Sequence, residues 1–191
     1  MTDAAAAPPK KMSMVLKVLI GVAGVVAILA GIVAIQPSKY KVERSATIAA
    51  PAAAVFDQVN ELKKWEAWSP WEKVDPAMKR TYEGPPAGTG AVYSWAGNKD
   101  VGEGRMTIVE SKPGEFVRLR LEFFKPMAGK STAEFTFKEE NKQTAVTWSM
   151  TGKKNFISKA FCMFMDMDKM LGGQFDKGLG QLKSASEGPR K

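Results

Sequence analysis

The hydrophobic pattern of this chain changes abruptly at Pro37. Before it, the eighteen residues from Val18 to Ile35 are all uncharged. As a helix they would extend about 27 Å, close to the ~30 Å hydrocarbon core of a bilayer. After Pro37, polar and apolar positions alternate as in a globular domain. The pattern predicts a disordered tail at residues 1–11, a transmembrane anchor helix at 12–36, one domain at 37–184 and a disordered tail at 185–191.

The apolar segment could be a retained anchor or a signal peptide. The apolar region of a signal peptide is usually about 7–15 residues long and ends in a small-x-small cleavage site. Here the run is longer and ends in Ala34-Ile35-Gln36, a poor cleavage site, so we expect a single-pass anchor. Basic residues are balanced on its two sides, so the positive-inside rule gives no direction. Because one N-terminal anchor usually exports the domain behind it, we expect an extracytoplasmic (periplasmic) domain.

Residues 38–152 show the period of strands with one short helix. Residues 40–48 alternate as a strand, and apolar residues from Val55 to Leu62 have the spacing of one buried helix face. Shorter alternating segments, separated by turn residues, follow at 79–83, 91–95, 104–110, 116–124, 131–138 and 144–152. Strict alternation gives a sheet one wet face and one covered face, which is typical of antiparallel sheets.

The cover is expected from the C-terminal segment. Apolar residues recur there at three- and four-residue steps from Ala160 to Leu182, which predicts one long amphipathic helix that frays after Leu182. Gly172-Gly173 in its middle would either bend the helix or permit a close approach. The predicted fold class is therefore α+β, a curved antiparallel sheet around a long C-terminal helix with a hollow between the two layers.

Composition excludes several kinds of chemistry. The chain has no histidine and one cysteine, which rules out histidine-based triads, histidine-containing zinc sites and an intramolecular disulfide. We expect no metal and no cofactor, and a buried, inert thiol at Cys162. The net charge is +8, but basic residues are scattered among acidic ones, so we expect no nucleic-acid partner. A tethered domain of this charge would be mildly attracted to anionic lipid headgroups.

Three tryptophans, Trp65, Trp68 and Trp71, occur within seven residues. They would form an aromatic lid over the mouth of the hollow, a satellite core between the first helix and the sheet, or anchors in the headgroup layer, and the core is slightly favoured. The other expected wall residues are Tyr82, Tyr93, Trp95, Leu121, Phe135 and Trp148 on the strands, with Met167, Leu171 and Phe175 on the closing helix.

The remaining candidates have plainer explanations. The parity of Arg44 would point it into the hollow, where it would need an acidic partner or ligand, unless it lies at an exposed strand start. Asp166 and Asp168 project in different directions and are expected to be solvated charges. The soft stretch formed by Phe161, Met163, Phe164, Met165, Met167 and Met170 would suit an adaptable ligand surface, although ordinary helix core is favoured.

The order of elements resembles the START-like helix-grip superfamily (SRPBCC), in its polyketide cyclase/dehydrase and lipid-transport branch. The matching sequences are Ala46-Thr47-Ile48-Ala49-Ala50-Pro51, the loop from Trp65 to Trp71, Gly88-x-Gly90 and Phe175-x-x-Gly178-Leu179-x-x-Leu182. The likeness spans roughly residues 39–184. It implies a hydrophobic cavity for lipids, sterols or polyketide-like molecules, with catalysis only in some branches.

Three functional hypotheses follow. The first is a membrane-tethered domain that binds a hydrophobic small molecule or lipid without covalent chemistry. The second is a polyketide cyclase/dehydrase-like enzyme, for which the sequence shows no catalytic constellation. The third is a module that binds proteins through its surface. The partners expected from the first are the ligand and the membrane. The small residues Ala23, Ala27 and Gly31 would also permit a weak homodimer through the anchor.

Overall fold

The computed structural model describes residues 13–163 and 166–188. Contacts between residues divide the chain into two units, with the boundary after Pro37. The described part of the first unit is helix α1 (Met14–Ile35), which begins after Ser13, whose hydroxyl accepts a hydrogen bond from the Leu16 amide at 3.3 Å. This helix is long and apolar enough to cross a membrane, although a signal sequence has the same length and composition.

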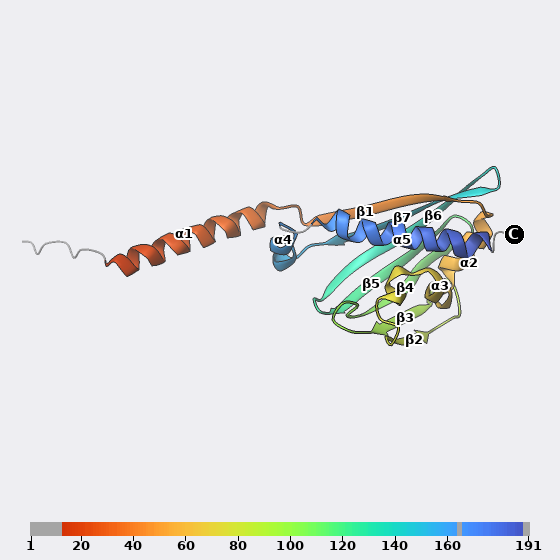
Figure 1. Ribbon diagram of the computed structural model, residues 1–191, viewed down its shortest axis with the longest axis horizontal. Helices are drawn as coiled ribbons and strands as arrows, with labels where there is room; N and C mark the ends of the chain where they lie inside the picture. The colour runs from red at the N-terminus through yellow and green to blue at the C-terminus, as the bar shows by residue number, and fades with distance from the viewer. Residues whose placement is uncertain (1–12, 164–165, 189–191) are drawn as a thin grey trace, which may run out of the picture. The chain divides into compact units, whose positions relative to one another are not determined.

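The second unit is built on a seven-stranded antiparallel sheet in the order β1-β7-β6-β5-β4-β3-β2 (Figure 1). The strands are β1 (Lys39–Ile48), β2 (Lys79–Glu83), β3 (Val92–Ala96), β4 (Glu103–Lys112), β5 (Phe116–Lys125), β6 (Gly129–Glu140) and β7 (Gln143–Lys153). The first and last strands pair along ten residues, from Lys39 opposite Lys153 to Ile48 opposite Thr144. The sequence prediction of an antiparallel sheet is confirmed, with strand limits close to those expected from alternation.

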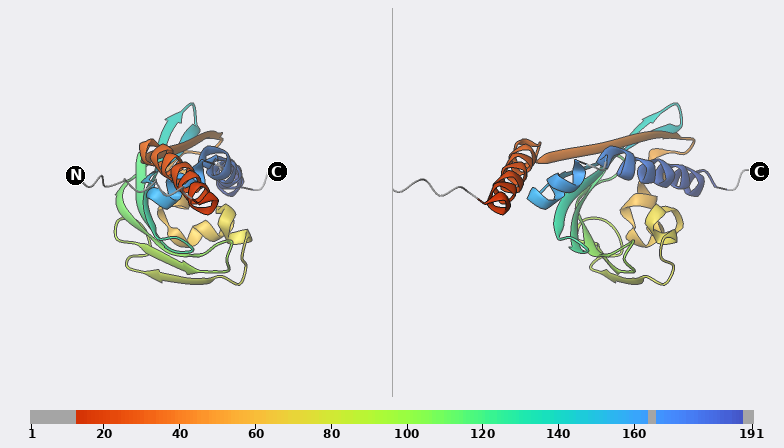
Figure 2. Two further views of the ribbon diagram at one scale, coloured as in Figure 1. Left: turned by 90° about the vertical axis from the view of Figure 1, so that its left-hand side faces the viewer. Right: turned by 60° about the vertical axis from the view of Figure 1, so that its left-hand side comes forward.

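Helices cover the inner face of this sheet, which curves around them in the left view of Figure 2. They are α2 (Ala52–Asn60), the short turns η1 (Leu62–Lys64), α3 (Trp65–Trp68) and η2 (Pro70–Lys73), and the long helix α5 (Met167–Glu187). Helix α4 (Phe156–Cys162), which has no buried residue, lies at the end of the sheet between β7 and α5 (Figure 1). The core lies between the layers, where α2 contributes Val55, Phe56 and Val59 and α5 contributes Phe175, Leu179 and Leu182. The domain has the predicted α+β class, a curved sheet that grips the long helix α5.

The C-terminal helix differs from its prediction at both ends. It does not begin near Ala160, because α4 ends at Cys162 and α5 begins at Met167, after Asp166. The Asp166 carboxylate accepts hydrogen bonds from the amides of Asp168 and Lys169 at 3.0 and 3.2 Å, which caps the new helix. The expected fraying after Leu182 is also wrong, since α5 continues to Glu187.

The soft stretch after residue 160 is not helix core, as had been favoured. Phe161, Met163 and Met170 are exposed and Met167 is half-buried, while Phe164 and Met165 lie outside the described residues. Cys162 is half-buried, so the expectation of a buried thiol is wrong as well. The apolar period that predicted one continuous helix therefore spans two helices, and only its C-terminal half faces the core.

Candidate functional site

A partly enclosed cavity of about 180 Å³ lies inside the domain. Most of its wall is aromatic or aliphatic, and its polar members are Ser69, Glu72 and the hydroxyls of Tyr40 and Tyr93. The lining residues are Tyr40, Trp65, Ser69, Trp71, Glu72, Met78, Tyr93, Trp95, Val101, Met106, Leu121, Phe123, Ala133, Trp148, Met150 and Leu171. Seven of the residues expected from the sequence are among them: Trp65, Trp71, Tyr93, Trp95, Leu121, Trp148 and Leu171.

The three clustered tryptophans have different positions. Trp65 and Trp68 are buried, with ring centroids 4.5 Å apart, and each ring meets Phe135 and Trp148 edge to face. Their indole N–H groups donate to the backbone oxygens of Val59 and Gln58 at 2.9 and 3.0 Å, so their burial leaves no polar atom unpaired. Trp68 therefore belongs to the core, whereas Trp65 and the half-buried Trp71 also face the cavity.

Trp148 connects the cavity to the core. Its ring is sandwiched between Phe135, at 4.7 Å, and Phe175, at 4.1 Å with the two planes almost parallel. The two phenylalanines are fully buried and are not in the cavity wall, and Met167 is also outside it. The indole nitrogen of Trp148 is buried and has no hydrogen-bond partner among the described residues. Such a group costs about 1–3 kcal/mol if it is unpaired.

The polar part of the wall is a buried carboxylate with two partners. Glu72, whose side chain is 6% exposed, accepts a hydrogen bond from the Tyr93 hydroxyl through Oε1 at 2.7 Å. Its Oε2 accepts one from Nε of Arg80, also at 2.7 Å. Burial, followed by this hydrogen bond, raises the pKa of Tyr93 above its ordinary value. Tyr93 is thus a neutral donor at physiological pH, and both oxygens of Glu72 are engaged.

Tyr82 lies outside the cavity wall. Its ring stacks on that of Tyr93, with centroids 5.1 Å apart, and its hydroxyl donates to Glu66 at 2.7 Å. Burial and the Glu66 carboxylate raise the pKa of Tyr82. Tyr93 in turn stacks on Trp95 of the same strand, at 5.9 Å. The cross-strand contact with Tyr82 and the contact with Trp95 therefore hold the Tyr93 ring in the wall.

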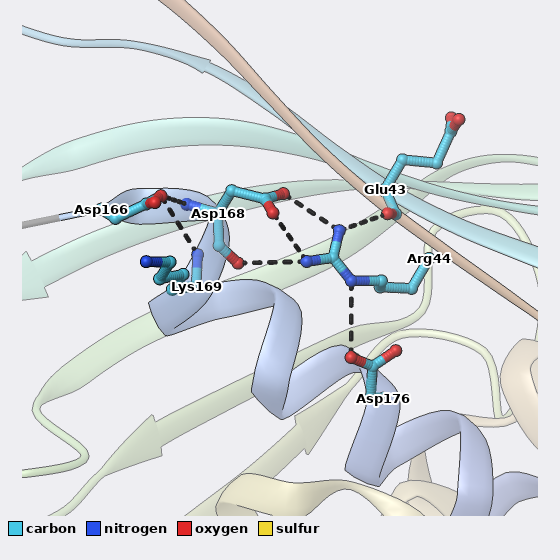
Figure 3. A network of polar contacts seen from close by, with 6 residues as sticks. All are labelled: Glu43, Arg44, Asp166, Asp168, Lys169 and Asp176. Carbon is cyan, nitrogen blue, oxygen red and sulfur yellow. Dashed lines mark hydrogen bonds and ion pairs between the residues drawn. The ribbon is translucent and has the colours of Figure 1, made fainter.

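Arg44 fastens the beginning of α5 to β1 (Figure 3). Its guanidinium donates to both carboxylate oxygens of Asp168, at 3.0 and 2.7 Å, and forms an ion pair with Asp176 at 3.4 Å. The Arg44 hydrogen bond is the main cause of a lowered pKa at Asp168. Arg44 therefore has the acidic partners that its parity required. Asp166 and Asp168 are exposed, as expected of solvated charges, but each also has a structural contact, because Asp168 pairs with Arg44 and Asp166 caps the helix.

Gly172 makes room for this contact. It lies one turn from both Asp168 and Asp176, and a Cβ at residue 172 would be 2.0 Å from Nη2 of Arg44. At Gly173, by contrast, nothing lies within 4 Å of such an atom. Of the two roles considered for the glycine pair, the close approach applies to Gly172. The next residue toward the N-terminus is Leu171, so this ion-paired segment also holds part of the cavity wall.

Sequence reasoning missed nine lining residues, of which Glu72 matters most for chemistry. Six of the nine are apolar: Met78, Val101, Met106, Phe123, Ala133 and Met150. Four of them lie on strands and two in loops, and none had been assigned to the cavity wall from the sequence. Glu72 lies in Trp71-Glu72-Lys73, which reads as solvated loop. Its burial depends on Tyr93 and Arg80, which are distant in sequence, so no local signal identified it.

A curved antiparallel sheet that grips a long C-terminal helix over an aromatic cavity defines a helix-grip domain. The sequence agrees, because residues 39–187 match the family model described as polyketide cyclase / dehydrase and lipid transport. The chain belongs to this family, and the resemblance noted from its sequence is confirmed. No curated protein matches the chain significantly.

Solved structures share the fold at low sequence identity. Protein CV1439 from Chromobacterium violaceum has a TM-score of 0.57 and 14% identity, covering 81% of this chain and 100% of its own. The Aha1 dimer from Colwellia psychrerythraea has a TM-score of 0.56 and 14% identity, covering 78% of this chain and 96% of its own. The di-domain ARO/CYC StfQ from the steffimycin biosynthetic pathway has a TM-score of 0.56 and 11% identity, covering 78% and 51%. At such identities the likeness shows the fold alone.

Proposed function

We propose that residues 38–188 bind one small, mostly apolar molecule between the sheet and α5, without covalent chemistry. The observation that carries the proposal is the cavity of about 180 Å³, with its aromatic wall and few polar groups. An apolar wall with a small number of oriented polar groups is typical of small-molecule sites. Membership of a family that includes cyclases and lipid-transport proteins supports the same function.

The volume limits the size of the ligand. Drug-sized ligands usually occupy about 300–1,000 Å³, and an apolar cavity of about 150 Å³ is enough for benzene. A cavity of about 180 Å³ therefore suits a one-ring or small two-ring molecule, or the end of one acyl chain. A sterol or a complete two-chain lipid would require the walls to move apart, so we narrow the ligand class to small aromatic molecules and single chains.

The polar groups in the wall are suited to positioning a ligand. Both oxygens of Glu72 already accept hydrogen bonds, from Arg80 and Tyr93. These two charge-assisted hydrogen bonds hold the carboxylate in one orientation, which suits it to keeping its neighbours in place. We infer that Glu72 orients the Tyr93 ring in the wall and does no chemistry.

The same observation defines the second candidate, a cyclase- or dehydrase-like enzyme. It is favoured by a buried carboxylate beside a tyrosine hydroxyl in the cavity wall, where ligand binding could rearrange their hydrogen bonds. A Glu72→Gln variant separates the two functions, because it keeps the size of the side chain and removes the charge. Loss of turnover of a polyketide-like aromatic substrate, with ligand affinity retained, would establish the enzyme.

Ligand binding can be measured on the full chain in lipid nanodiscs with 5-fluoroindole followed by ¹⁹F NMR. We expect a resonance from protein-bound indole that decanoate displaces and cholesterol does not. A Leu171→Trp variant, which fills the cavity, is the control for partitioning of the probe into lipid. Identical spectra for the wild type and Leu171→Trp would overturn the proposal.

We also infer that α1 is retained as a single-pass anchor and that the domain is extracytoplasmic. The length and composition of α1 support the anchor, and the placement follows from its position ahead of the whole domain. Intact mass of the protein isolated from membranes tests retention, since cleavage would remove α1. Protease accessibility in spheroplasts tests the side, because a cytoplasmic domain would be protected.

A further inference from the structure

Exposed apolar side chains gather in two segments of the domain. Within residues 38–163 and 166–188, nine large hydrophobic side chains are exposed. Only Val74 and Val109 lie elsewhere. The end of β5 and the turn after it contribute two, and residues 156–170 contribute five: Phe124, Met127, Phe156, Ile157, Phe161, Met163 and Met170. Single exposed apolar residues are ordinary, but such a concentration marks an interaction surface.

Helix α4 has its apolar side outward. Phe156, Ile157 and Phe161 share one side of the helix and are 54%, 68% and 52% exposed. Ser158 and Lys159, on the other side, are half-buried. A surface helix in water normally shows the reverse arrangement. The apolar side of α4 is therefore available to an apolar partner.

The two segments belong to the same end of the sheet. Lys39 at the start of β1 pairs with Lys153 at the end of β7, and Gly129 at the start of β6 pairs with Phe123 near the end of β5. The β5–β6 turn and the β7–α4 connection both leave the sheet at this end, as Figure 1 shows. We call it the α4 end surface, defined by Phe124, Met127, Phe156, Ile157 and Phe161.

The charge at this end is basic. No acidic residue occurs between Glu140 and Asp166, a stretch that contains Lys153, Lys154 and Lys159. In the other segment, Lys125 and Lys130 pair with Glu103 and Glu122. Asp168, which lies near Lys154, pairs with Arg44. Within the described residues no ion pair involves Lys153 or Lys154, so these two lysines give this end an excess of positive charge. Aromatic and aliphatic side chains beside lysines are the composition of helices that lie in a membrane interface, especially on anionic lipids.

We propose that the α4 end surface docks on the surface of the bilayer, with Phe156, Ile157 and Phe161 in the headgroup layer. Continuity of the chain identifies this partner, because three residues, Gln36, Pro37 and Ser38, separate α1 from β1, whose first residue is at this end. The proposal rests on retention of α1 as an anchor. It is independent of whether the cavity binds a ligand.

Cys162, the only cysteine, provides a reporter at the end of α4. The full chain is labelled there with the fluorophore NBD and reconstituted in vesicles that contain doxyl-labelled lipid. The matched control carries Cys162→Ser and Val109→Cys, which moves the label to an exposed residue of β4. Val109 lies toward the end of β4 that is farther from the α4 end surface. We expect lipid quenching of the label at Cys162 to be at least twofold stronger than that of the label at residue 109.

The quenching of the label at Cys162 should also depend on the lipid composition of the vesicles and on the salt concentration. It should increase when phosphatidylglycerol is added to phosphatidylcholine, and decrease when salt is raised from about 0.1 M to about 1 M, which shortens the Debye length from ~10 Å to ~3 Å. A Phe156→Asp/Ile157→Asp variant should lose the excess quenching and keep its melting temperature, because both side chains are exposed. Equal quenching of the two labels in wild type would overturn the proposal. So would self-quenching in detergent that rises with protein concentration, which would show that a second copy covers the surface.

Discussion

Because Arg44 packs against Gly172, alanine should have different effects on stability at the neighbouring Gly172 and Gly173. Alanine in a helix is favoured over glycine by about 0.8–1.0 kcal/mol. At the exposed Gly173, where an added Cβ meets nothing, Gly173→Ala should stabilise the protein by about that amount. At Gly172 the same atom would displace the Arg44 guanidinium from Asp168 and Asp176, and the gain should be cancelled.

Urea unfolding of the two variants, at neutral pH and low salt, measures this difference directly. A Gly172→Ala/Arg44→Met double variant is the internal control, because without the guanidinium residue 172 should recover the full benefit of alanine. Equal stabilisation by Gly172→Ala and Gly173→Ala would mean that the ion pairs of Arg44 do not require a glycine at residue 172.

The pairing of Arg44 also predicts how stability changes with acid. Arg44 lowers the pKa of Asp168 from its ordinary value of 3.8. A carboxylate with a lowered folded-state pKa stabilises the protein fully above its unfolded pKa, and the contribution is lost as the pH falls through the lowered value. We therefore expect Asp168→Asn to be less stable than wild type at pH 7. The two curves should converge as the pH falls below about 4. A constant difference from pH 7 to pH 2 would contradict this origin.

The two stacked tyrosines should respond differently to loss of their hydroxyls. Tyr93→Phe removes a donor from the buried Glu72, and leaving a buried carboxylate oxygen unpaired costs about 1–3 kcal/mol or more. Tyr82→Phe removes a donor from the exposed Glu66, where water replaces it, so the loss should be below about 1 kcal/mol. Chemical denaturation compares the variants at pH 7, and similar losses would show that Glu72 is accessible to water.

At the scale of the element, α5 combines a wall of the cavity with ordinary core. Leu171 is half-buried and lines the cavity, whereas Leu179 is 2% exposed and lies in the packed core. Leu179→Trp should therefore destabilise the domain by about 1–3 kcal/mol, as overpacking does. Leu171→Trp should leave the melting temperature close to that of wild type and abolish binding of 5-fluoroindole. A large loss of stability in both variants would mean that no usable space exists at Leu171.

The elements themselves were largely predictable from the sequence, because alternation and helical period are local properties. The strand from Lys79 to Glu83 was placed at its observed limits. The division between α4 and α5 was missed because apolar residues keep their helical spacing across a break that the Asp166 cap creates. The burial of Glu72 could not be predicted, since Arg80 and Tyr93 become its partners only when β2 and β3 pair.

At the scale of the whole molecule, the second unit has the features of an independent domain. It contains the complete sheet, its own core and both partners of the pairing between β1 and β7. We expect a chain that begins at Ser38 to unfold cooperatively, with a melting temperature close to that of the full chain. Calorimetry of the two proteins in the same detergent tests this. A broad, uncooperative transition in the shorter chain would show that α1 contributes to folding.

The short connection between α1 and β1 has a consequence for transport. Three residues extend at most about 11 Å, far less than the gap between two cellular membranes. With α1 retained, the domain cannot shuttle cargo from one bilayer to another as a diffusing carrier would. It can exchange a molecule only with the leaflet to which it is tied or with a partner that approaches that leaflet. If α1 is retained, the length of Gln36-Pro37-Ser38 therefore keeps the domain at one membrane, and any molecule that donates or accepts a ligand has to reach it there.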